Sequence, residues 1–349
     1  MAAAYDGPMI VDALPFDGLS PDVVLESVES VGLACDGRLM ALNSYENRVY
    51  RLGIDPLAAE NPDPGIVPDA AVVKFYRPGR WTDAQLREEH EFALELVAAG
   101  LPVAAPLRLQ GRCLHHHGEQ RFAVFECRRG GAPELDAPGA RQLLGRTLGR
   151  LHAVGGRRVF GYRERLDDSR CGARARSTVL GLSALPDAVR AGYAQVSAVL
   201  VEAIAAAFAP FEGERELRLH GDCHLGNILW SATGPVFVDL DDCRGGPAVQ
   251  DLWMFLSGGS PDTQRAEWSQ LLEGYEQFAE FDYAQTALIE PLRALRMLEH
   301  TAWVGSRWRD PAFPRAFPWV AEPRWWEGHV ADLRDQIEAL ANPPLLRSW

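Results

Sequence analysis

The most informative segment of the sequence is HGDCHLGN, which runs from His220 to Asn227 between two apolar stretches. Asp222 and Asn227 stand five residues apart in it, a spacing that suits a loop carrying a proton acceptor and a neutral oxygen ligand for a metal ion. Phosphoryl transfer needs such positioned groups more than it needs covalent help from the protein. The same residues could instead form local hydrogen bonds in an Asx-rich turn, so the loop alone leaves both interpretations open.

A run of three carboxylates follows the next strand-like segment, PVFV. Like charges crowded at the end of a strand are unfavourable without a cation, and magnesium prefers hard oxygen ligands. Asp239 directly follows the apolar run, so its position is the most rigid and we select it as the metal ligand. We interpret Asp241 and Asp242 as residues that structure the loop or support the ligand.

Two further charged residues precede this region. Lys74 lies inside the strand-like segment AVVKFY, where a lysine usually faces solvent. The segment 82–99 is predicted to be a helix, and Glu89 falls within its apolar stripe, whereas Glu88 points away. A carboxylate on an apolar stripe needs a partner, and Lys74 is the natural one. Such a lysine–glutamate pair holds the α- and β-phosphates of ATP in protein kinases. The stripe consists of Leu86, Ala93, Leu96 and Val97.

The elements that must position these residues change in kind along the chain. The first 130 residues or so are mostly strand-like with one long helix, and helices dominate after Gly130. This order indicates an α+β, bilobal, protein-kinase-like fold, with a small β-rich lobe followed by a larger helical lobe. We place the nucleotide-binding lobe at 1–128 and the catalytic and substrate lobe at 129–349. The expected segments are a helix at 20–34, hairpins at 38–53, 106–127 and 227–240, a loop at 53–69, a strand at 71–78 and a helix at 140–154.

Composition narrows the classes of function. The 349 residues are 47% hydrophobic, enough to fill the cores of two lobes, and the net charge is −13, which gives no basic footprint for nucleic acid. The six cysteines include no CxxC pair, so reduced thiols are expected. We see no signal peptide, and no apolar run approaches the ~18–20 residues that span a bilayer. A cytoplasmic protein that contacts no membrane is the expectation.

Longer motifs then resemble a known family. HGD-x-x-x-x-N followed by VDLDD resembles the aminoglycoside phosphotransferase and choline kinase superfamily. The segments LNSYENRVYRL, VVKFYRPGRWT, REEHEFALEL, GPAVQDLWM and DPAFPRAFPW narrow the resemblance to the bacterial stress response kinase A family, which are serine/threonine protein kinases. The resemblance runs from about residue 33 to residue 344 and is thin between 161 and 216.

The resemblance implies a role for each matching residue. Asp222 would be the catalytic base, Asn227 and Asp239 would hold Mg²⁺, and Asp239 would thereby also be catalytic. His220 and Asp251 would support the catalytic loop. The hairpin NSYEN would stand where other kinases have a glycine-rich loop, although it contains no glycine. The residues implied to contact ATP are Ser44, Lys74, Glu89, Phe125, Glu126 and Cys127.

The function that follows is that of a monomeric kinase in a bacterial stress response. It would use Mg²⁺ and ATP to phosphorylate a protein serine or threonine hydroxyl. One alternative is a small-molecule kinase acting on an amino alcohol or sugar, which the same machinery would serve. A second alternative is a pseudokinase that binds nucleotide as a switch, against which the intact set of Lys74, Asp222, Asn227 and Asp239 argues.

Several other features receive ordinary structural interpretations. The run His115-His116-His117 is expected in a solvated hairpin turn, and Cys223 and Cys243 are expected to be inert apolar residues. His224 could contact phosphate or serve the hydrogen bonding of its loop. The tryptophans near the end of the chain are expected mainly in the core. These are Trp303, Trp308, Trp319, Trp325 and Trp326.

Overall fold

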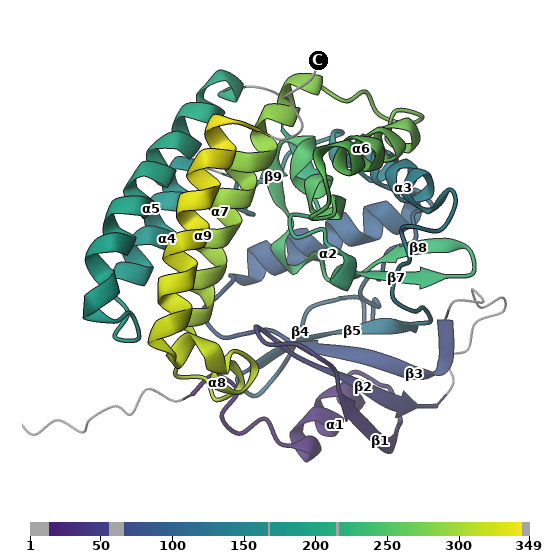
Figure 1. Ribbon diagram of the computed structural model, residues 1–349. Coiled ribbons are helices and arrows are strands. Elements are labelled where there is room, and N and C mark those ends of the chain that lie inside the picture. Colours follow the sequence, from purple (N-terminus) through teal and green to yellow (C-terminus); the bar gives the residue numbers. More distant parts are fainter. Residues whose placement is uncertain (1–13, 56–65, 167, 214–215, 344–349) are drawn as a thin grey trace, which may run out of the picture.

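A small β-rich lobe and a larger helical lobe make up the molecule (Figure 1). The computed structural model describes residues 14–55, 66–166, 168–213 and 216–343. The small lobe is built on a five-stranded sheet of order β1-β2-β3-β5-β4, in which every described pairing is antiparallel. Its strands are β1 (Cys35–Ala41), β2 (Arg48–Ile54), β3 (Ile66–Phe75), β4 (His115–His117) and β5 (Gln120–Arg128).

One face of the sheet carries the apolar core of the small lobe. Helix α1 (Pro21–Glu29) begins after Ser20, whose hydroxyl accepts a hydrogen bond from the Val23 amide, and it has Pro21 in its first turn. It packs Val24 and Val28 against the sheet. The sheet residues of this core include Leu52, Val73, Phe75, Phe122 and Val124, which are at most 1% exposed.

Helix α2 (Asp83–Ala98) lies between the sheet and the large lobe (Figure 1). Thr82 and Gln85 form a capping box at its start, and Gly100 follows its end with a φ of 73°. Glu89 is buried on this helix as expected. The expected stripe is wrong at Val97, which is 39% exposed, because the buried face turns toward Phe92 instead.

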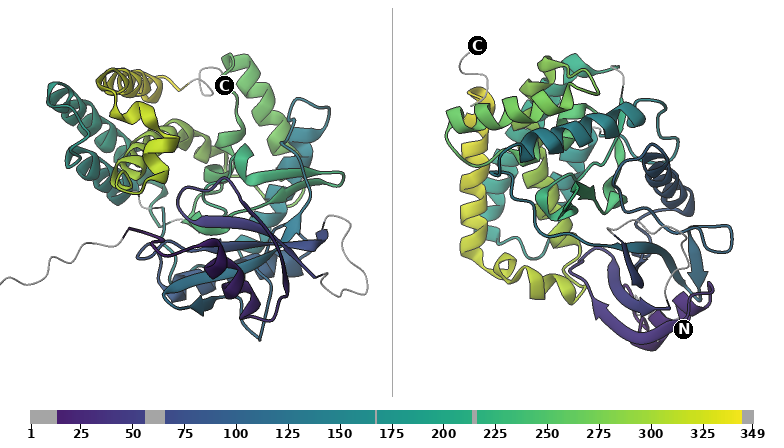
Figure 2. Two further views of the ribbon diagram at one scale, coloured as in Figure 1. Left: turned by 90° about the horizontal axis from the view of Figure 1, so that it is seen from below. Right: turned by 90° about the vertical axis from the view of Figure 1, so that its right-hand side faces the viewer.

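The large lobe consists of layered helices. Figures 1 and 2 show α4, α5, α7 and α9 side by side at one end and α3 with α6 at the other. Helices α3 and α6 approach through glycine, since a Cβ on Gly145 would come within 1.9 Å of the Leu271 carbonyl oxygen. The helices are α3 (Ala140–Gly155), α4 (Asp168–Leu180), α5 (Asp187–Phe208), α6 (Pro261–Tyr275), α7 (Ile289–Ser306), α8 (Ala312–Ala316) and α9 (Pro323–Ala341).

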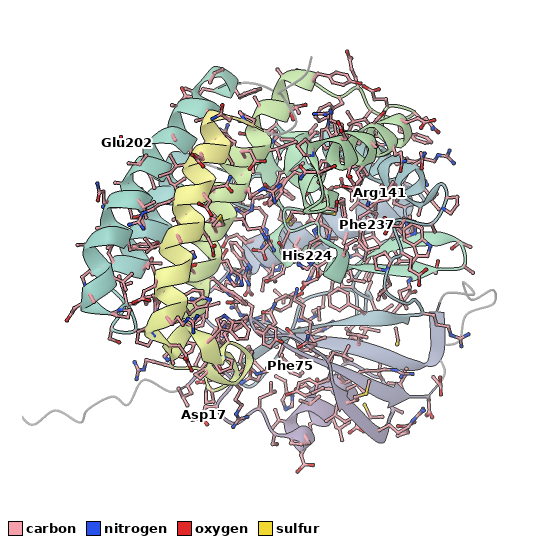
Figure 3. All side chains as sticks on the ribbon, in the orientation of Figure 1. Asp17, Phe75, Arg141, Glu202, His224 and Phe237 are labelled. Atoms are coloured by element: carbon pink, nitrogen blue, oxygen red, sulfur yellow. The ribbon has the colours of Figure 1, made fainter. Side chains whose placement is uncertain are left out.

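Two short two-stranded sheets lie between the helices and the small lobe. β6 (Leu217–Leu219) pairs with β9 (Arg244–Gly246), and β7 (Ile228–Ser231) pairs with β8 (Gly234–Phe237). The predicted catalytic loop follows β6, and the run of carboxylates follows β8. Figure 3 shows His224, within the catalytic loop, close to the boundary between the lobes.

Four expectations need correction or remain open. The three histidines form strand β4 and not a turn, because they pair with Gln120–Phe122 in register. The statement that no apolar run could span a bilayer is wrong by length and composition, because 187–211 forms such a helical stretch. Within the fold, α5 packs on α4, α7 and α9.

The predicted loop at 53–69 falls largely outside the described residues. β5 ends at Arg128, where we divided the chain, and that domain division stays a prediction.

Candidate active site

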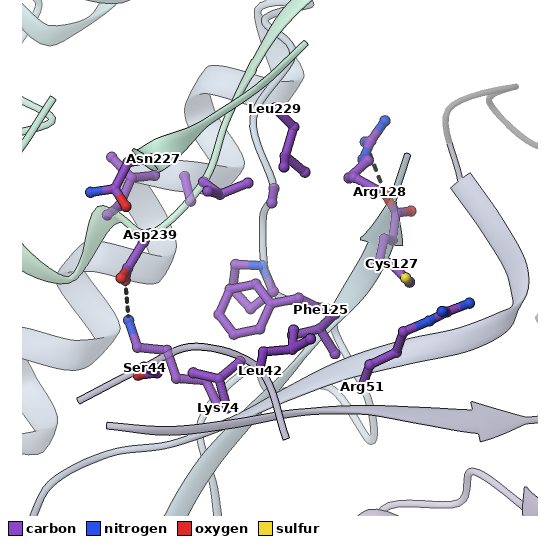
Figure 4. A pocket seen from close by; sticks show the side chains of 18 of the residues that line it. Leu42, Ser44, Arg51, Lys74, Phe125, Cys127, Arg128, Asn227, Leu229 and Asp239 are labelled. Atoms are coloured by element: carbon purple, nitrogen blue, oxygen red, sulfur yellow. Dashed lines mark hydrogen bonds and ion pairs between the residues drawn. The ribbon is translucent and has the colours of Figure 1, made fainter. Parts of the chain in front are cut away.

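A cavity of about 790 Å³ opens between the two lobes (Figure 4). Leu42, Val49 and Val72 line it from the small lobe, and Leu229 and Val238 line it from the large lobe. These apolar walls suit a flat ring. Figure 4 shows Ser44, Lys74, Asn227 and Asp239 at one end of the cavity, which we call its polar end, and Arg51 and Arg128 at the other. The cavity also contains every residue for which the sequence implied contact with ATP or metal: Ser44, Lys74, Glu89, Phe125, Glu126, Cys127, Asn227 and Asp239.

Lys74 is the buried cation at the polar end of the cavity. Its Nζ lies 2.7 Å from Asp239 Oδ1, 3.1 Å from Asp241 Oδ1 and 3.8 Å from Glu89 Oε1. Burial would lower the pKa of Lys74, but the three carboxylates raise it well above its usual value. The lysine is therefore charged and positioned to neutralise phosphate. Its partnership with Glu89, expected from the sequence, is the longest of the three contacts.

Glu89 lines the cavity from α2, whereas Glu88, the preceding residue, is not part of the lining. Burial raises the pKa of Glu89, while Lys74 opposes that rise. The guanidinium of Arg163 also lies 3.9 Å from Glu89. Glu88 has a different set of contacts. Its carboxylate accepts hydrogen bonds from the backbone amides of Gly161, Tyr162 and Arg163 at 2.5–2.8 Å. Glu88 thus ties α2 to the segment that supplies Arg163.

The side chains of the three carboxylates after β8 differ in how far they are buried. Asp239 has a side chain 49% exposed toward the cavity and a backbone φ of 60°, in the left-handed region. Asp241 is buried and also pairs with Arg80 at 2.8 Å, while Asp242 pairs with Arg80 at 2.6 Å. Asp239 is therefore the most exposed of the three carboxylates, although it is paired with Lys74.

Asn227 and Asp222 come from the loop after β6. Asn227 Nδ2 donates to the Asp222 carbonyl oxygen at 2.9 Å, which leaves the Asn227 Oδ1 as the free acceptor of that amide. Asp222 Oδ1 accepts from Arg296 at 2.5 Å, and Oδ2 lies 3.3 Å from His224 Nε2. Burial would raise the pKa of Asp222, but His224 and Arg296 hold it well below its usual range.

Asp251 and His220 hold that loop from beneath. Asp251 is fully buried and accepts hydrogen bonds from the backbone amides of His220 at 2.7 Å and Gly221 at 2.8 Å. His152 Nε2 lies 3.1 Å from the same carboxylate. His220 reaches across to the Val238 carbonyl oxygen at 2.9 Å, next to Asp239. These contacts agree with the supporting roles expected for both residues.

The hairpin NSYEN owes its shape to charged side chains and not to glycine. Ser44 donates to the Asn47 carbonyl oxygen at 3.2 Å. Glu46 accepts from the indole of Trp303 at 2.5 Å and from Arg307 at 3.1 Å, so residues of the large lobe hold it. Asp310 adds a buried link between the lobes, with Arg77 at 2.6 Å and Arg48 at 2.9 Å.

Several functional neighbours escaped the reasoning from sequence. Arg80, Arg163 and Arg296 contact carboxylates of the site, and Asp310 contacts Arg48 and Arg77 near the NSYEN hairpin. Isolated arginines and aspartates in a sequence give no signal of a distant partner. The cysteine interpretation agrees with the geometry, because Cys223 and Cys243 are buried and burial raises the pKa of both thiols, that of Cys243 to about 12.

The contacts of the histidine run and of the tryptophans can be compared with the interpretations from sequence. No group of three His, Cys, Asp or Glu side chains that could hold a metal occurs within the described part of the chain, which includes β4. Trp326 is fully buried, as expected for a core residue, whereas Trp319 is 45% exposed. Trp303 differs from the expectation, because its indole contacts Glu46 of the small lobe and so joins the two lobes.

Known proteins confirm the class that this geometry defines. Residues 39–289 match the phosphotransferase enzyme family, so the chain belongs to that family. Within it, stress response kinase A of Escherichia coli K12 is 41% identical over 95% of this chain and 97% of its own. A serine/threonine protein kinase, RdoA of Salmonella typhimurium, is 40% identical over 96% of this chain and 97% of its own.

Solved structures confirm the fold. An amicoumacin kinase bound to AMP-PNP and Ca²⁺ superposes with a TM-score of 0.66 at 18% identity, covering 93% of this chain and 95% of that one. A microcompartment-associated aminopropanol kinase gives 0.66 at 21% identity, covering 93% and 99%. The expected family, bilobal fold and phosphotransferase activity are therefore confirmed.

Proposed function

We propose that this protein is a serine/threonine protein kinase that transfers the γ-phosphoryl group of ATP, with Mg²⁺, to a protein hydroxyl. The observation that carries the proposal is one cavity that brings Lys74, Asn227 and Asp239 together beside Asp222. The identity to stress response kinases over 95% of the chain supports the choice of acceptor and a role in a stress response. We also propose that the protein is monomeric and lies in the cytoplasm.

The residues at the polar end of the cavity fit a divalent cation. Asn227 has its amide oriented by the Asp222 carbonyl, and Asp239 faces the open cavity. These are the hard oxygen donors that magnesium prefers. A cation held by Asn227 and Asp239 would neutralise charge on the phosphates when bound. Lys74 supplies the protein's own positive charge to the same region.

The chemical step then rests on Asp222. The acceptor oxygen attacks the γ-phosphorus, the bond between that phosphorus and the leaving ADP oxygen breaks, and the hydroxyl proton passes to the Asp222 carboxylate. Asp251 keeps the loop in place by accepting from two consecutive amides. The adenine is proposed to lie between Val49, Val72 and Leu229, next to the backbone of Phe125, Glu126 and Cys127.

The test is a phosphotransfer assay on the purified full chain with γ-labelled ATP and Mg²⁺. A generic protein substrate and a panel of amino alcohols and sugars serve as competing acceptors. Label recovered as phosphoserine or phosphothreonine supports the proposal. Label found only in a small alcohol establishes the small-molecule alternative, and nucleotide binding without ATP consumption establishes the pseudokinase.

A further inference from the structure

The proposed catalytic base has an arginine as its direct partner. Arg296 of α7 donates to Asp222 Oδ1 at 2.5 Å, and its side chain is 41% exposed. Asp222 is itself 26% exposed, so the pair lies at an accessible surface and not in the core. A carboxylate that must receive a proton from the acceptor is therefore held by a cation that an incoming molecule can reach.

The face of α7 that carries Arg296 looks toward both lobes of the site. Residues three, four and seven positions apart share one face of a helix, which groups Arg296 with Glu299, His300 and Trp303. Trp303 contacts Glu46 of the NSYEN hairpin at 2.5 Å. The ring of His300 lies 6.0 Å from that of Phe317, which in turn lies 5.2 Å from Tyr45. This face therefore runs from the catalytic loop to the small-lobe hairpin.

Other carboxylates on the segments that flank the catalytic loop have cationic partners of their own. Asp242 pairs with Arg80 at 2.6 Å and lies 3.7 Å from Arg244, with which Glu299 also interacts. On the side of the catalytic loop, His224 faces the second oxygen of Asp222 at 3.3 Å. An acceptor that carries an amine would meet the like charge of Arg296, whereas an acceptor that carries a carboxylate would compete with Asp222 for the partly exposed guanidinium.

We propose that Arg296 selects acceptor hydroxyls that lie beside a carboxylate, namely serine or threonine within an acidic protein segment. This inference rests on the proposed protein kinase function. An acidic side chain of the acceptor pairs with the guanidinium, which releases Asp222 Oδ1 to accept the proton of the hydroxyl. Because the whole chain carries a net charge of −13, long-range attraction does not favour an acidic partner, and the selectivity arises locally at Arg296.

The experiment compares three peptides that differ only beside a central serine, where they carry Glu, Gln or Lys. Wild type is compared with Arg296→Gln and Arg296→Glu, with Mg-ATP saturating and kcat/KM as the readout. Arg334→Gln, on the part of α9 that faces α5, is the matched control for loss of one positive charge. Thermal melts and nucleotide titrations establish that each variant is folded and binds ATP.

The expected result is that wild type and Arg334→Gln prefer the Glu peptide to the Gln peptide roughly tenfold and accept the Lys peptide least. Arg296→Gln removes the preference, and Arg296→Glu turns it toward the Lys peptide. Peptides phosphorylated by wild type without regard to charge, or a ranking unchanged in Arg296→Glu, overturn the role of Arg296 and leave the kinase function standing. If no peptide is labelled and an amino alcohol is, the proposed function and this inference both fail.

Discussion

Lys74 and Asp239, 165 residues apart in the sequence, form a direct ion pair of 2.7 Å across the cavity between the lobes. Figure 4 shows the two side chains facing each other, with Asn227 beside Asp239. Asp241 and Glu89 share the same lysine at 3.1 Å and 3.8 Å. Lys74 thus contacts three carboxylates, of which Asp241 also pairs with Arg80 and Glu89 also lies near Arg163.

The first prediction concerns metal dependence at Asp239. Asp239→Asn should remove most activity and weaken nucleotide binding when Mg²⁺ is present, because one anionic ligand is lost. Without Mg²⁺ the same variant should bind nucleotide at least as well as wild type, since a negative charge near the phosphates has gone and Lys74 is freed. Nucleotide titrations with and without Mg²⁺ measure both effects, with the exposed Asp262→Asn on α6 as control. Near-normal turnover in Asp239→Asn would transfer the ligand role to Asp241.

The second prediction separates two neighbouring glutamates on α2. Glu89→Ala should lower kcat/KM at least ~10-fold, because Lys74 loses a buried partner that helps to position it. Glu88→Ala should affect activity less and instead lower the melting temperature, because three backbone amides lose their acceptor. Glu91→Ala, at an exposed position of the same helix, is the control. Equal losses of activity in the Glu88 and Glu89 variants would contradict the different roles assigned to these two glutamates.

The sequence located the chemistry well because the relevant residues lie in contiguous motifs. Asp222 and Asn227 lie in one loop, and Asp239 follows an apolar strand, so short-range patterns suffice to place them. Glu89 could be assigned by helical phase alone. Glu89, Asn227 and Asp239 line one cavity, and Asp222 is hydrogen-bonded to Asn227 beside it, whereas the catalytic roles of these residues stay predictions.

What sequence reasoning missed depends on packing between distant segments. Arg296 and its partner Asp222 are 74 residues apart in the sequence, and Asp310 and Arg77 are 233 residues apart. No local sequence pattern predicts either contact. The exposure of Val97 was missed for a related reason, because the buried arc of α2 is set by what the large lobe covers. The pairing of His115 in β4 depends on the turn that follows it.

The third prediction concerns the link between the lobes at Asp310. Asp310 and Arg77 are 3% and 5% exposed, so Asp310→Ala removes one of the two carboxylates that this buried guanidinium contacts and leaves only Glu46, at 3.1 Å. Removing one partner of a buried pair typically costs about 3–5 kcal/mol of unfolding free energy. Denaturant unfolding should show a loss on that scale, while Asp332→Ala at an exposed position of α9 should show almost none. Equal unfolding free energies for the two variants would contradict a structural role for this link.

The fourth prediction concerns acid stability at His329. Burial lowers its pKa to about 4, and its ring lies 5.2 Å from that of Trp325 with an interplanar angle of 4°. The unfolded chain has a histidine pKa near ~6.5 and so binds the proton first as the pH falls. The stability contributed at neutral pH is therefore lost progressively from pH ~6.5 down to about 4, by up to about 3 kcal/mol.

His329→Gln should flatten that pH dependence, because glutamine can keep a hydrogen bond to Thr301 without titrating. Unfolding free energies of both proteins at several pH values between 7 and 4 provide the comparison. His116→Gln, at an exposed position of β4, controls for loss of a histidine. Parallel pH profiles for wild type and His329→Gln would exclude His329 as the source of the acid lability.

The last prediction separates catalysis from folding at two aspartates of the same loop. Asp222→Asn loses a partly exposed ion pair, so the melting temperature should change little, and the variant should still bind Mg-ATP through Lys74 and Asp239. Its turnover should fall at least ~10²–10⁴-fold, as expected when a general base is lost. Asp251→Asn should lower both stability and activity, because an amide cannot accept from two backbone N–H groups and His152 as the buried carboxylate does. Paired melts and phosphotransfer assays measure this; a large melting shift confined to Asp222→Asn would exchange the two roles.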